Sequence, residues 1–572
     1  MAFSSCHFGN VQQHFSTPCG CLVAPVIEGA EILRITAAEV FNASHPSFPV
    51  LQAPEVSGVN FCNVTVSLRH HGADDTVFVY VWLPLRGWNG RYQAVGGGGL
   101  SAGLGDRSLM HQVDNGYASS WTEAGLTLNQ TIDPTTAIWA LKEDGSLNED
   151  LLLNLSWRSA HDMAVISKDI IKQFYGAEPE YSYWHGCSQG GRQGYAVASK
   201  IPHAFDGILA IAPMLDWPRL MAAELWPMVV MNNMGIPPPC LLEEYRRATL
   251  AACDQPDGAI DGLISNAQCI RKFAFDFGSL VGKSITCDEI PGGTDTKGRS
   301  KHSRLMSAKT LIVNSTHSAI VRKLMEGPTT ADGRVLWHGI APGTRFDALA
   351  NISKNDRGSY EAVPFKIAEN WIKHIVLRNP TYDVASMSFT EFERVFNESV
   401  ETQSRLFGDQ ELDLLPFSQS GGKLLSWTGM SDRYNSPLTL MRYYEVVQDQ
   451  FGGTQALDEF YRLFLAPGVD HCCGGGGPAP NNAFKALVHW VEDGNSPDVL
   501  PAARIAEDGI VTSRNLCRYP RESAYRGGDI RSADSFECKL LGISAGLEKG
   551  HHRQTCAISF AQALEDRTVA LR

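Results

Sequence analysis

The chain has 572 residues, of which 44% are hydrophobic and 19% are charged. This balance is that of a globular protein and excludes a disordered chain, and the glycines and prolines show no collagen-like period. With 49 basic and 62 acidic residues the net charge is −13, which argues against a nucleic acid partner. No apolar run reaches the length of a membrane-spanning helix, so no membrane partner is expected.

Cysteines and glycosylation sequons favour an oxidising compartment. Fourteen cysteines are more than core packing requires, although some of them could be buried free thiols. Seven N-x-S/T sequons also favour the secretory route. They lie at Asn42, Asn63, Asn129, Asn154, Asn314, Asn351 and Asn397. The start of the chain, however, has neither the basic residues nor the apolar run of a signal peptide, so an intracellular location stays open beside the favoured secreted one.

Strands and helices are predicted to alternate in two parts of the chain. The first part has two β-rich runs within 77–97, a helix over 156–176, a strand at 181–185, a helix at 191–200 and a strand within 205–213. The second part has a strand within 421–429, a helix at 437–451, a strand at 462–466 and a helix around 482–492. Strand, helix and strand in this order predict a parallel sheet with helices on its faces.

The alternation is lost between about residues 216 and 410, where the periodicity is irregular. We therefore predict an α/β fold with a discontinuous catalytic domain (1–215 and 411–538), an inserted lid domain (216–410) and a polar C-terminal tail (539–572).

A candidate nucleophile follows the strand at 181–185. The segment GCSQG places Ser188 in a G-x-S-x-G pattern between a predicted strand and a predicted helix. A nucleophile on such a tight turn needs glycine neighbours, because the packed backbone leaves no room for a Cβ. By itself the pattern is weak and also fits an ordinary glycine-rich turn.

An acid and a base follow in the order that this architecture uses. Asp432 comes after the strand KLLSWTG, and His471 comes after the strand RLFLAPG. Both should lie at the sheet edge where ligands bind in open α/β sheets. Asp470 is a competing acid, and His185 is the next candidate base, although it precedes the serine and is better explained as structural.

Two cysteines make this set of residues more specific. Cys187 directly precedes Ser188, and Cys472 directly follows His471. A disulfide holds its two Cα atoms about 4.4–6.8 Å apart, so this pair would make the serine and the histidine neighbours. Cys473 is a rival for the pairing, and Cys187 could instead be a free thiol.

Backbone amides are expected to bind the developing oxyanion. The N–H of Gln189 follows the nucleophile directly, and the second donor should come from the run Gly96–Gly99, with Gly97 and Gly98 as candidates. Neither this run nor Gly474–Gly477 is followed by the Lys-Ser/Thr of a phosphate-binding loop.

A second cluster lies in CDQPDGAIDGLISNAQC. Asp254, Asp257 and Asp261 are close enough to repel one another unless a cation offsets their charge, and hard oxygen ligands suit Ca²⁺. The register is not that of an EF-hand, and a solvated acidic turn is the alternative. Cys253 and Cys269 bracket the loop and could close it.

Taken together, these segments resemble the tannase and feruloyl esterase family of fungi and bacteria. The resemblance is carried by NGRYQAVGGGG, GCSQGGRQG, CDQPDGAIDG, GKLLSWTGMSD, APGVDHC and LCRYP, in that order over about residues 15–540. The chain departs from the family at Asp470, where a small residue is usual, at Cys473, where glycine is expected, and in its tail after Cys538.

The resemblance implies an α/β-hydrolase fold with an inserted lid and a catalytic triad of Ser188, Asp432 and His471 beside a Cys187–Cys472 bridge. It also implies structural Ca²⁺ held by the side chains of Asp254, Asp257 and Asp261 and by the carbonyl groups of Ala259 and Leu263. The disulfides that it implies are Cys253–Cys269, Cys517–Cys538 and, more weakly, Cys19–Cys62.

We therefore expect a serine carboxylic ester hydrolase acting on small esters of aromatic acids, such as gallic or hydroxycinnamic acids, with acid recognition in the lid. One alternative is an intracellular hydrolase or acyltransferase of a secondary-metabolite pathway with the same triad. Another is a calcium-stabilised binding module on an inactive hydrolase scaffold. The sequence does not indicate an oligomeric state.

Overall fold

A computed structural model of the chain describes residues 17–51, 53–127, 132–287, 309–355, 358–408 and 413–540. Its centre is a nine-stranded sheet with the strand order β1-β2-β3-β5-β4-β6-β7-β12-β13. The strands are β1 Ala30–His45, β2 Val56–His70, β3 Val77–Pro84, β4 Arg91–Val95, β5 Ala118–Thr122, β6 Tyr181–Cys187, β7 Gly207–Ile211, β12 Lys423–Gly429 and β13 Tyr461–Ala466. Most of the predicted tail (541–572) and the sequon at Asn129 lie outside the described residues.

The sheet is mixed rather than wholly parallel. From β5 through β4, β6, β7 and β12 to β13 all neighbours are parallel, whereas β1, β2, β3 and β5 pair antiparallel with one another. The parallel strands that were predicted at 181–185, 205–213, 421–429 and 462–466 are confirmed. They are apolar runs buried on both faces, as strands covered by helices on each side should be.

The two β-rich runs within 77–97 form β3 and β4, but β5 lies between them in the sheet. The turn after β3 therefore does not close a hairpin of adjacent strands. β1 and β2, with 16 and 15 residues, add an antiparallel edge that the sequence analysis did not identify.

Helices cover both faces of the sheet. α3, α4 and α13 pack on one face, and α1 and α15 contact the strands from the other. The bounds of the helices outside the region between β7 and β12 are α1 Met110–Asp114, α2 Glu149–Leu153, α3 Ser159–Tyr175, α4 Gln189–Lys200, α13 Pro437–Gln450, α14 Thr454–Leu457 and α15 Ala483–Asp493. The predicted helix over 156–176 ends as expected, because Gly176 adopts a left-handed conformation there.

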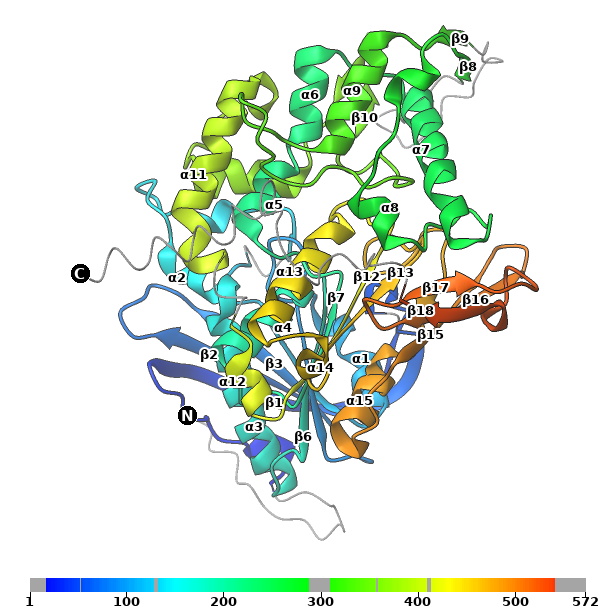
Figure 1. Ribbon diagram of the computed structural model, residues 1–572. Helices are drawn as coiled ribbons and strands as arrows, with labels where there is room; N and C mark the ends of the chain where they lie inside the picture. The colour runs from blue at the N-terminus through cyan, green and yellow to red at the C-terminus, as the bar shows by residue number, and fades with distance from the viewer. Residues whose placement is uncertain are drawn as a thin grey trace.

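A mainly helical region separates β7 from β12 in the chain, although these two strands are neighbours in the sheet. We call this region, residues 212–422, the insert. Figure 1 shows its part from α6 to α11 in green to yellow-green above the sheet, whereas α12 lies lower, against α4. Its hydrophobic core also includes side chains from 137–155, so the insert is packed onto the first part of the chain. Its elements are α5 Trp217–Ala223, α6 Trp226–Met234, α7 Pro239–Asp254, α8 Ala267–Arg271, α9 Ser315–Glu326, α10 Lys366–Asn370, α11 Phe389–Phe407, α12 Leu415–Gln419, β8 Ser284–Cys287, β9 Lys309–Ile312, β10 Ile352–Lys354 and β11 Tyr360–Ala362.

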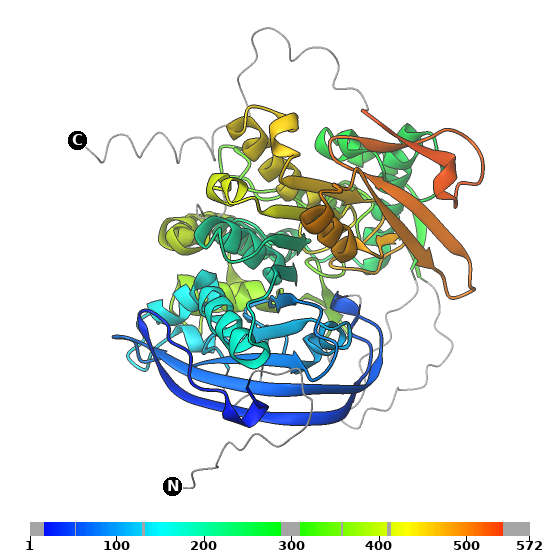
Figure 2. The same cartoon turned by 90° about the horizontal axis from the view of Figure 1, so that it is seen from below.

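Short antiparallel strands complete the C-terminal part and lie at the opposite end of the molecule from β1–β3 (Figure 2). They are β14 Ala479–Pro480, β15 Val499–Ile505, β16 Val511–Cys517, β17 Glu522–Tyr525 and β18 Phe536–Lys539. The Cys517–Cys538 disulfide joins β16 to β18. The predicted pairs Cys19–Cys62 and Cys253–Cys269 are also present, and Cys240–Cys287 is a further disulfide that was not predicted.

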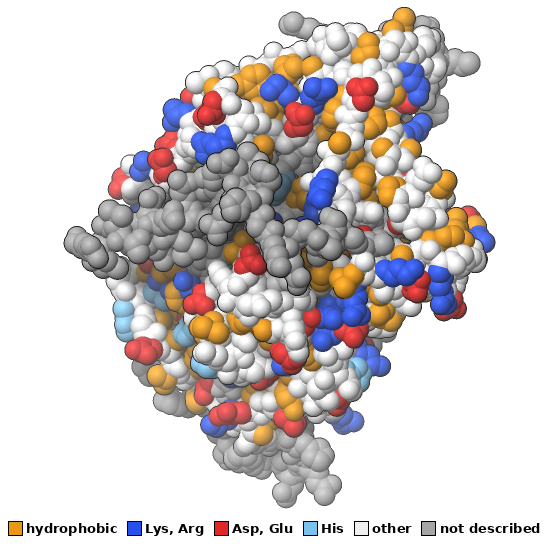
Figure 3. All heavy atoms as spheres, viewed as in Figure 1, with side chains coloured by type: hydrophobic (Ala, Val, Ile, Leu, Met, Phe, Trp, Pro, Cys, Tyr) orange, Lys and Arg blue, Asp and Glu red, His pale blue; other side chains and the backbone are white. Residues whose placement is uncertain are grey.

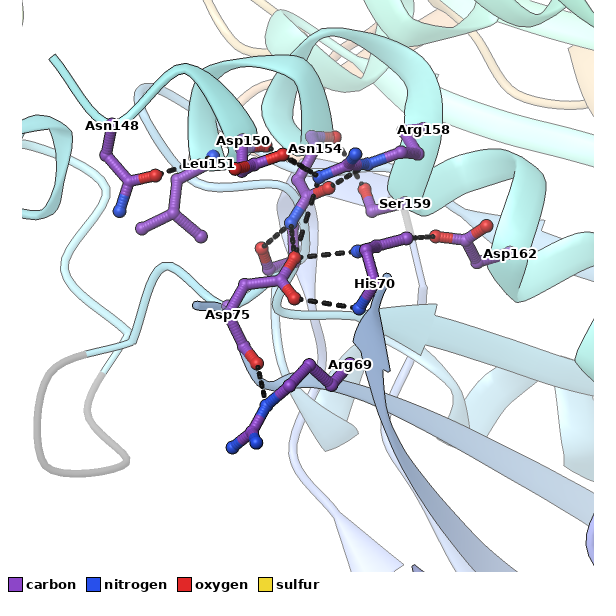
Figure 4. Close-up of polar contacts among 12 residues, drawn as sticks. Arg69, His70, Asp75, Asn148, Asp150, Leu151, Asn154, Arg158, Ser159 and Asp162 are labelled. Carbon is purple, nitrogen blue, oxygen red and sulfur yellow. Dashed lines mark hydrogen bonds and ion pairs between the residues drawn. The ribbon is translucent and has the colours of Figure 1, made fainter. Parts of the chain in front are cut away.

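A buried polar network ties β2 to the helical layer (Figure 4). The imidazole of His70 lies between Asp75, at 2.7 Å from Nδ1, and Asp162 of α3, at 2.9 Å from Nε2. Asn154 donates to Asp75 and lies between α2 and α3. Because Asn154 is fully buried, its sequon is not accessible to glycosylation in the folded protein.

On the face shown in Figure 3, the described acidic and basic side chains are interspersed rather than separated by sign. That face therefore offers no continuous basic surface to a phosphate backbone. None of the helices in the described residues is long and apolar enough to cross a membrane.

Candidate active site

Ser188 occupies the tight turn between β6 and α4, as predicted. Its backbone has φ 62° and ψ −122°, a strained conformation for a residue with a side chain. A Cβ on Gly186 would lie 2.3 Å from the backbone of Gly190, and a Cβ on Gly190 would lie 2.9 Å from the carbonyl oxygen of Gly97. The close packing therefore requires glycine on both sides of the serine and holds the turn in place.

Asp432 and His471 are hydrogen-bonded to each other. His471 Nδ1 lies 2.7 Å from Asp432 Oδ2, and the backbone N–H groups of Tyr434 and Asn435 donate to the other carboxylate oxygen. Asp432 is only 2% exposed, so it is held as a buried carboxylate by three donors. It follows β12 and His471 follows β13, as the strand order predicted.

The electrostatics of this pair favour a basic imidazole. Burial lowers the pKa of His471, but the charge of Asp432 and its hydrogen bond outweigh that effect, so the pKa lies above the ordinary value of 6.5. The hydrogen bond also orients the ring, which leaves Nε2 as the nitrogen available to another partner.

Asp470 does not compete for the imidazole. Its carboxylate accepts hydrogen bonds from the backbone N–H groups of His471 and Arg433 and forms an ion pair with the Arg433 side chain. It therefore joins the two loops that carry His471 and Asp432. His185, the other candidate base, lies inside β6, where burial lowers its pKa to about 4 and Phe484 stacks on its ring. That environment fits the structural role expected for it.

The Cys187–Cys472 disulfide is present, with the two Cα atoms 5.7 Å apart. It fixes the residue before Ser188 next to the residue after His471. The rival pairing is not made, because Cys473 is a free thiol whose Sγ donates to the carbonyl oxygen of Pro49.

One of the predicted oxyanion donors is wrong. The backbone N–H of Gly97 donates to the Gln193 side chain at 2.8 Å, so it is not available to a substrate. Gln193 lies on α4, and sequence alone does not show that its side chain reaches back to the glycine run. The roles of the Gln189 and Gly98 N–H groups stay predictions; Gly98 also pairs with Ser101 in an isolated β-bridge.

Ser188 and His471 line one cavity, with a volume of about 260 Å³. The insert supplies most of its remaining wall, through α5 and the residues at the start of α10. We call it the main cavity. Its lining is Gly99, Thr135, Ser188, Gln189, Met214, Trp217, Met221, Phe365, Lys366, Ile367, Tyr434 and His471.

α4 and α5 are packed together next to this cavity. The buried Arg192 of α4 donates to the carbonyl groups of Leu155 and Ser156, and its guanidinium lies 4.8 Å from the ring centre of Trp217. The helix that begins at the nucleophile therefore contacts the insert wall directly. Trp217 and Met221 were not predicted as site residues, although their spacing of four residues places them on one helix face.

The acidic loop after α7 is closed by the Cys253–Cys269 disulfide. Asp254 accepts from the N–H groups of Asp261 and Gly262, and Asp261 pairs with the buried Arg514. One oxygen of Asp257 is buried without a partner. Among the described residues no group of three His, Cys, Asp or Glu is gathered closely enough to hold a metal ion. One carboxylate oxygen of Asp257 therefore has no hydrogen-bond partner, whereas Asp254 accepts from backbone N–H groups and Asp261 pairs with Arg514.

A strained serine at a strand-to-helix turn, in one cavity with a buried His–Asp pair and on a largely parallel sheet, defines the class of α/β-hydrolases. The family model described as "Tannase and feruloyl esterase" matches residues 62–539. The chain therefore belongs to this family, and it is a carboxylic ester hydrolase.

Individual relatives agree with this assignment. The chain is 38% identical over 527 residues to a probable feruloyl esterase of Arthroderma benhamiae. The aligned region covers 91% of this chain and 93% of that protein. Among solved structures it is similar to a tannin acyl hydrolase from Aspergillus niger, with a TM-score of 0.78, 25% identity and coverage of 90% and 92%. A feruloyl esterase B from Aspergillus oryzae has a TM-score of 0.71, 24% identity and coverage of 90% and 97%.

Proposed function

We propose that the protein hydrolyses esters of aromatic acids through an acyl-enzyme formed on Ser188. The observation that carries this proposal is that the strained serine and the Asp432-bound His471 share one cavity and are joined through a disulfide between their neighbours. A serine hydroxyl is a weak nucleophile until an oriented base removes its proton, and this arrangement supplies such a base.

In the first half-reaction the Ser188 oxygen bonds to the ester carbonyl carbon while His471 takes the hydroxyl proton. The bond to the leaving alkoxide then breaks, and His471 delivers the proton to it. The N–H groups of Gln189 and Gly98 stabilise the oxyanion. In the second half-reaction His471 takes a proton from water, the water oxygen attacks the acyl carbon, and the acid leaves as the proton returns to Ser188.

The lining of the main cavity favours a methoxylated hydroxycinnamate over gallate as the acid. Met214, Met221 and Ile367 present apolar atoms that suit a methoxy group. The three hydroxyls of a gallate ring would each need a polar partner, which among the described polar side chains away from the triad and its tight turn only Thr135, Lys366 and Tyr434 could supply. A buried hydroxyl without a partner costs about 1–3 kcal/mol. Support also comes from the Arthroderma relative, which is named a feruloyl esterase.

The insert acts as a lid in this proposal. Trp217 and Phe365 belong to it and line the main cavity, and its Asp347 forms an ion pair with Arg433 beside the catalytic acid. A lid in this position excludes water from the acyl group and contacts the acid part of the ester, which gives it a role in substrate specificity.

Hydrolysis of a panel of methyl ferulate, methyl caffeate, methyl gallate and p-nitrophenyl acetate tests the function. We expect the highest kcat/KM for the ferulate ester, and we expect Ser188→Ala to remove both turnover and covalent labelling by a fluorophosphonate. Turnover that persists in Ser188→Ala would refute the mechanism, whereas preference for gallate would refute only the proposed acid. Transfer of the acyl group to an added alcohol in preference to water would favour the acyltransferase alternative.

The acidic loop is proposed to bind one structural Ca²⁺. Asp254, Asp257 and Asp261 would supply carboxylate oxygens, and Ala259 and Leu263 would supply carbonyl oxygens, a hard-oxygen set that suits this ion. The unpartnered buried oxygen of Asp257 supports a cation there. Nothing places the loop in the main cavity, so the ion would stabilise the fold rather than the reaction.

Calcium removal tests this proposal. We expect EDTA to lower the melting temperature and Ca²⁺, but not Mg²⁺, to restore it, because an ion that binds only the folded state stabilises it. Asp257→Asn should abolish the effect of Ca²⁺. A melting temperature that is the same with EDTA and with excess Ca²⁺ would contradict the site.

We further propose that the protein is extracellular. The five disulfides whose two cysteines both lie in the described residues support this location, as do the exposed sequons at Asn42, Asn314, Asn351 and Asn397. Secreted protein whose mass falls after N-glycosidase treatment is the expected observation. Protein retained in the cytosol with reduced cysteines would contradict it.

A further inference from the structure

A second, smaller cavity lies against the carboxylate of Asp432. We call it the rear cavity; its volume is about 30 Å³, and its lining includes the polar residues Glu224, His338, Asp432, Arg433, Tyr434 and Ser436. Tyr434 lines both cavities and packs edge-on against His471, with ring centres 5.2 Å apart. The rear cavity thus belongs to the surroundings of the proposed catalytic acid, but neither Ser188 nor His471 is among its lining residues.

Glu224 is the unexplained group in this cavity. It follows α5, is 2% exposed, and neither of its carboxyl oxygens has a hydrogen-bond partner among the described residues. The Ser436 hydroxyl is also buried there without a partner. Buried polar groups are nearly always hydrogen-bonded, and an unpaired buried carboxylate would be very costly.

The surroundings of Glu224 favour its neutral form. Burial, followed by the charge of Asp432, raises the pKa of Glu224 well above its ordinary value of 4.5. Among the described residues that line the cavity, Arg433 is the one arginine or lysine, and it is paired with Asp470 and Asp347. His338 is neutral because burial, followed by the charge of Arg442, lowers its pKa to about 4. A carboxylic acid, unlike a carboxylate, has a proton to donate.

We infer that Glu224 is a positioning residue for the triad, which donates a hydrogen bond through water in the rear cavity to Asp432 and thereby limits the basicity of His471. The cavity has room for one or two water molecules, since one needs about 10–15 Å³. Asp432 accepts three hydrogen bonds, and a carboxylate has about four acceptor sites, so one site remains. A hydrogen bond donated to that site reduces the electrostatic stabilisation of the His471 imidazolium by Asp432.

This inference rests on the proposed roles of Asp432 and His471. It implies that His471 loses its proton at a lower pH than it would without Glu224. The other charged or titratable groups that face this region are Arg433, Tyr434, Asp470, Cys473, Asp347, His338 and Arg442. His338 is neutral above about pH 5 because its pKa is lowered to about 4, and burial raises the pKa of Tyr434 and of Cys473 above their ordinary values, so none of these three groups gains charge where His471 titrates.

The test compares Glu224→Met, which cannot donate, with Glu224→Gln, whose amide can. The acid limb of the kcat/KM profile reports the pKa of His471 in the free enzyme. We expect Glu224→Met to move the midpoint of this limb upward by about half a pH unit or more, and Glu224→Gln to keep the wild-type midpoint. Ser399→Ala is the matched control, since Ser399 is a buried hydroxyl bonded to Pro218 of α5 but outside both cavities. It should leave the midpoint unchanged.

Two results would overturn the inference. One is a wild-type midpoint in Glu224→Met. The other is a lower midpoint in Glu224→Gln, which would mean that Glu224 is ionised in the wild type. This second variant keeps the test decisive if Glu224→Met does not fold.

A measurement without substrate separates this inference from the proposed function. The proton on His471 Nδ1, in its bond to Asp432, can be followed by NMR as the free enzyme is titrated. The same upward shift in Glu224→Met supports the inference even if no ester in the panel is hydrolysed. An active enzyme whose His471 titrates identically in both proteins would refute the inference alone.

Discussion

Asp432 and Asp470 both bind His471, but they hold different parts of it. Asp432 bonds to the ring nitrogen, whereas Asp470 bonds to the backbone N–H and to the neighbouring loop through Arg433. The two aspartates therefore have separable effects on the protein. One sets the tautomer and charge of the imidazole, and the other sets the position of the loop.

Asp432→Asn should lower kcat by about 10³–10⁴, because the amide favours the wrong histidine tautomer while the fold is kept. The rate of ester hydrolysis and the melting temperature should be measured together. Asp470→Asn is the matched control, and it should lower the melting temperature with a much smaller loss of kcat. Equal losses of kcat in the two variants would assign the orienting role to neither residue.

The pH dependence of activity should follow the raised pKa of His471. The base must be neutral to accept the serine proton, so kcat/KM should fall as the pH drops through that pKa. We expect the midpoint of this acid limb above 6.5, the ordinary value for histidine, because the charge of Asp432 favours the imidazolium. A midpoint at or below 6.5 would mean that burial outweighs Asp432.

At the scale of single residues, the sequence predicted those site residues that can be recognised from their order in the chain and their spacing. Ser188, Asp432 and His471 each follow a predicted strand, and the cysteines beside Ser188 and His471 indicated that these two residues are neighbours. The prediction of Gly97 as an oxyanion donor was wrong because the Gln193 side chain, on helix α4, accepts a hydrogen bond from the Gly97 N–H. Glu224 was not predicted as a site residue because its place beside Asp432 also depends on how a helix packs. Contacts of this kind depend on how helices pack across the sheet, which no local pattern reports.

The Cys187–Cys472 disulfide acts between elements, since it ties the end of β6 to the loop after β13. Replacing both cysteines by alanine should lower kcat by about 10²-fold, because a displacement of about 1 Å in a catalytic group has an effect of that size. The protein should remain folded at the assay temperature, as judged by near-UV circular dichroism. Cys473 should also be replaced in this variant, so that it cannot form a new bridge.

Removing Cys517 and Cys538 is the control for this pair. That bridge joins β16 to β18 in the C-terminal part and should contribute stability without positioning the triad. We expect a lower melting temperature with a nearly unchanged kcat. If both pairs affect kcat equally, the active-site bridge has no special positional role.

At the scale of elements, strands flanked by helices were predictable and strands paired across a distance were not. β6, β7 and β12 are short apolar runs bounded by turns, and their type followed from composition. The place of β5 between β3 and β4 was not evident, because adjacency in a sheet depends on pairing that local sequence does not encode. The long strands β1 and β2, which form the antiparallel end of the sheet, were missed altogether.

For the whole molecule, the loss of strand–helix alternation predicted an inserted domain over 216–410, and the structure has a mainly helical region between β7 and β12. How the insert packs against the rest of the protein could not be predicted from this loss of alternation, because its hydrophobic core includes side chains from residues 137–155 of the first part of the chain. Ser156 and Arg192 show how close this junction is, since the Ser156 hydroxyl donates to Leu406 of α11 and Arg192 reaches Trp217 of α5. The insert and the sheet are therefore expected to unfold together.

The His70 network predicts how global stability depends on pH. Burial would lower the pKa of His70, but the bonds to Asp162 and Asp75 raise it from 6.5 to about 9, and the pKa of Asp75 is lowered although burial opposes this. The His70 contribution is therefore fully present below about pH 6.5 and lost as the pH rises through 9. The Asp75 contribution is present above its ordinary value of 3.8 and lost on further acidification.

His70→Asn should lower the free energy of unfolding by roughly 3 kcal/mol near pH 6, since each pKa unit corresponds to about 1.4 kcal/mol. The difference from the wild type should shrink between pH 7 and 10, as measured by urea unfolding at each pH. His489→Asn is the control, because the His489–Asp493 pair is exposed on α15 and such pairs contribute little. A difference that stays constant across this range would mean that His70 stabilises the fold by packing alone and that no imidazolium is held between Asp75 and Asp162.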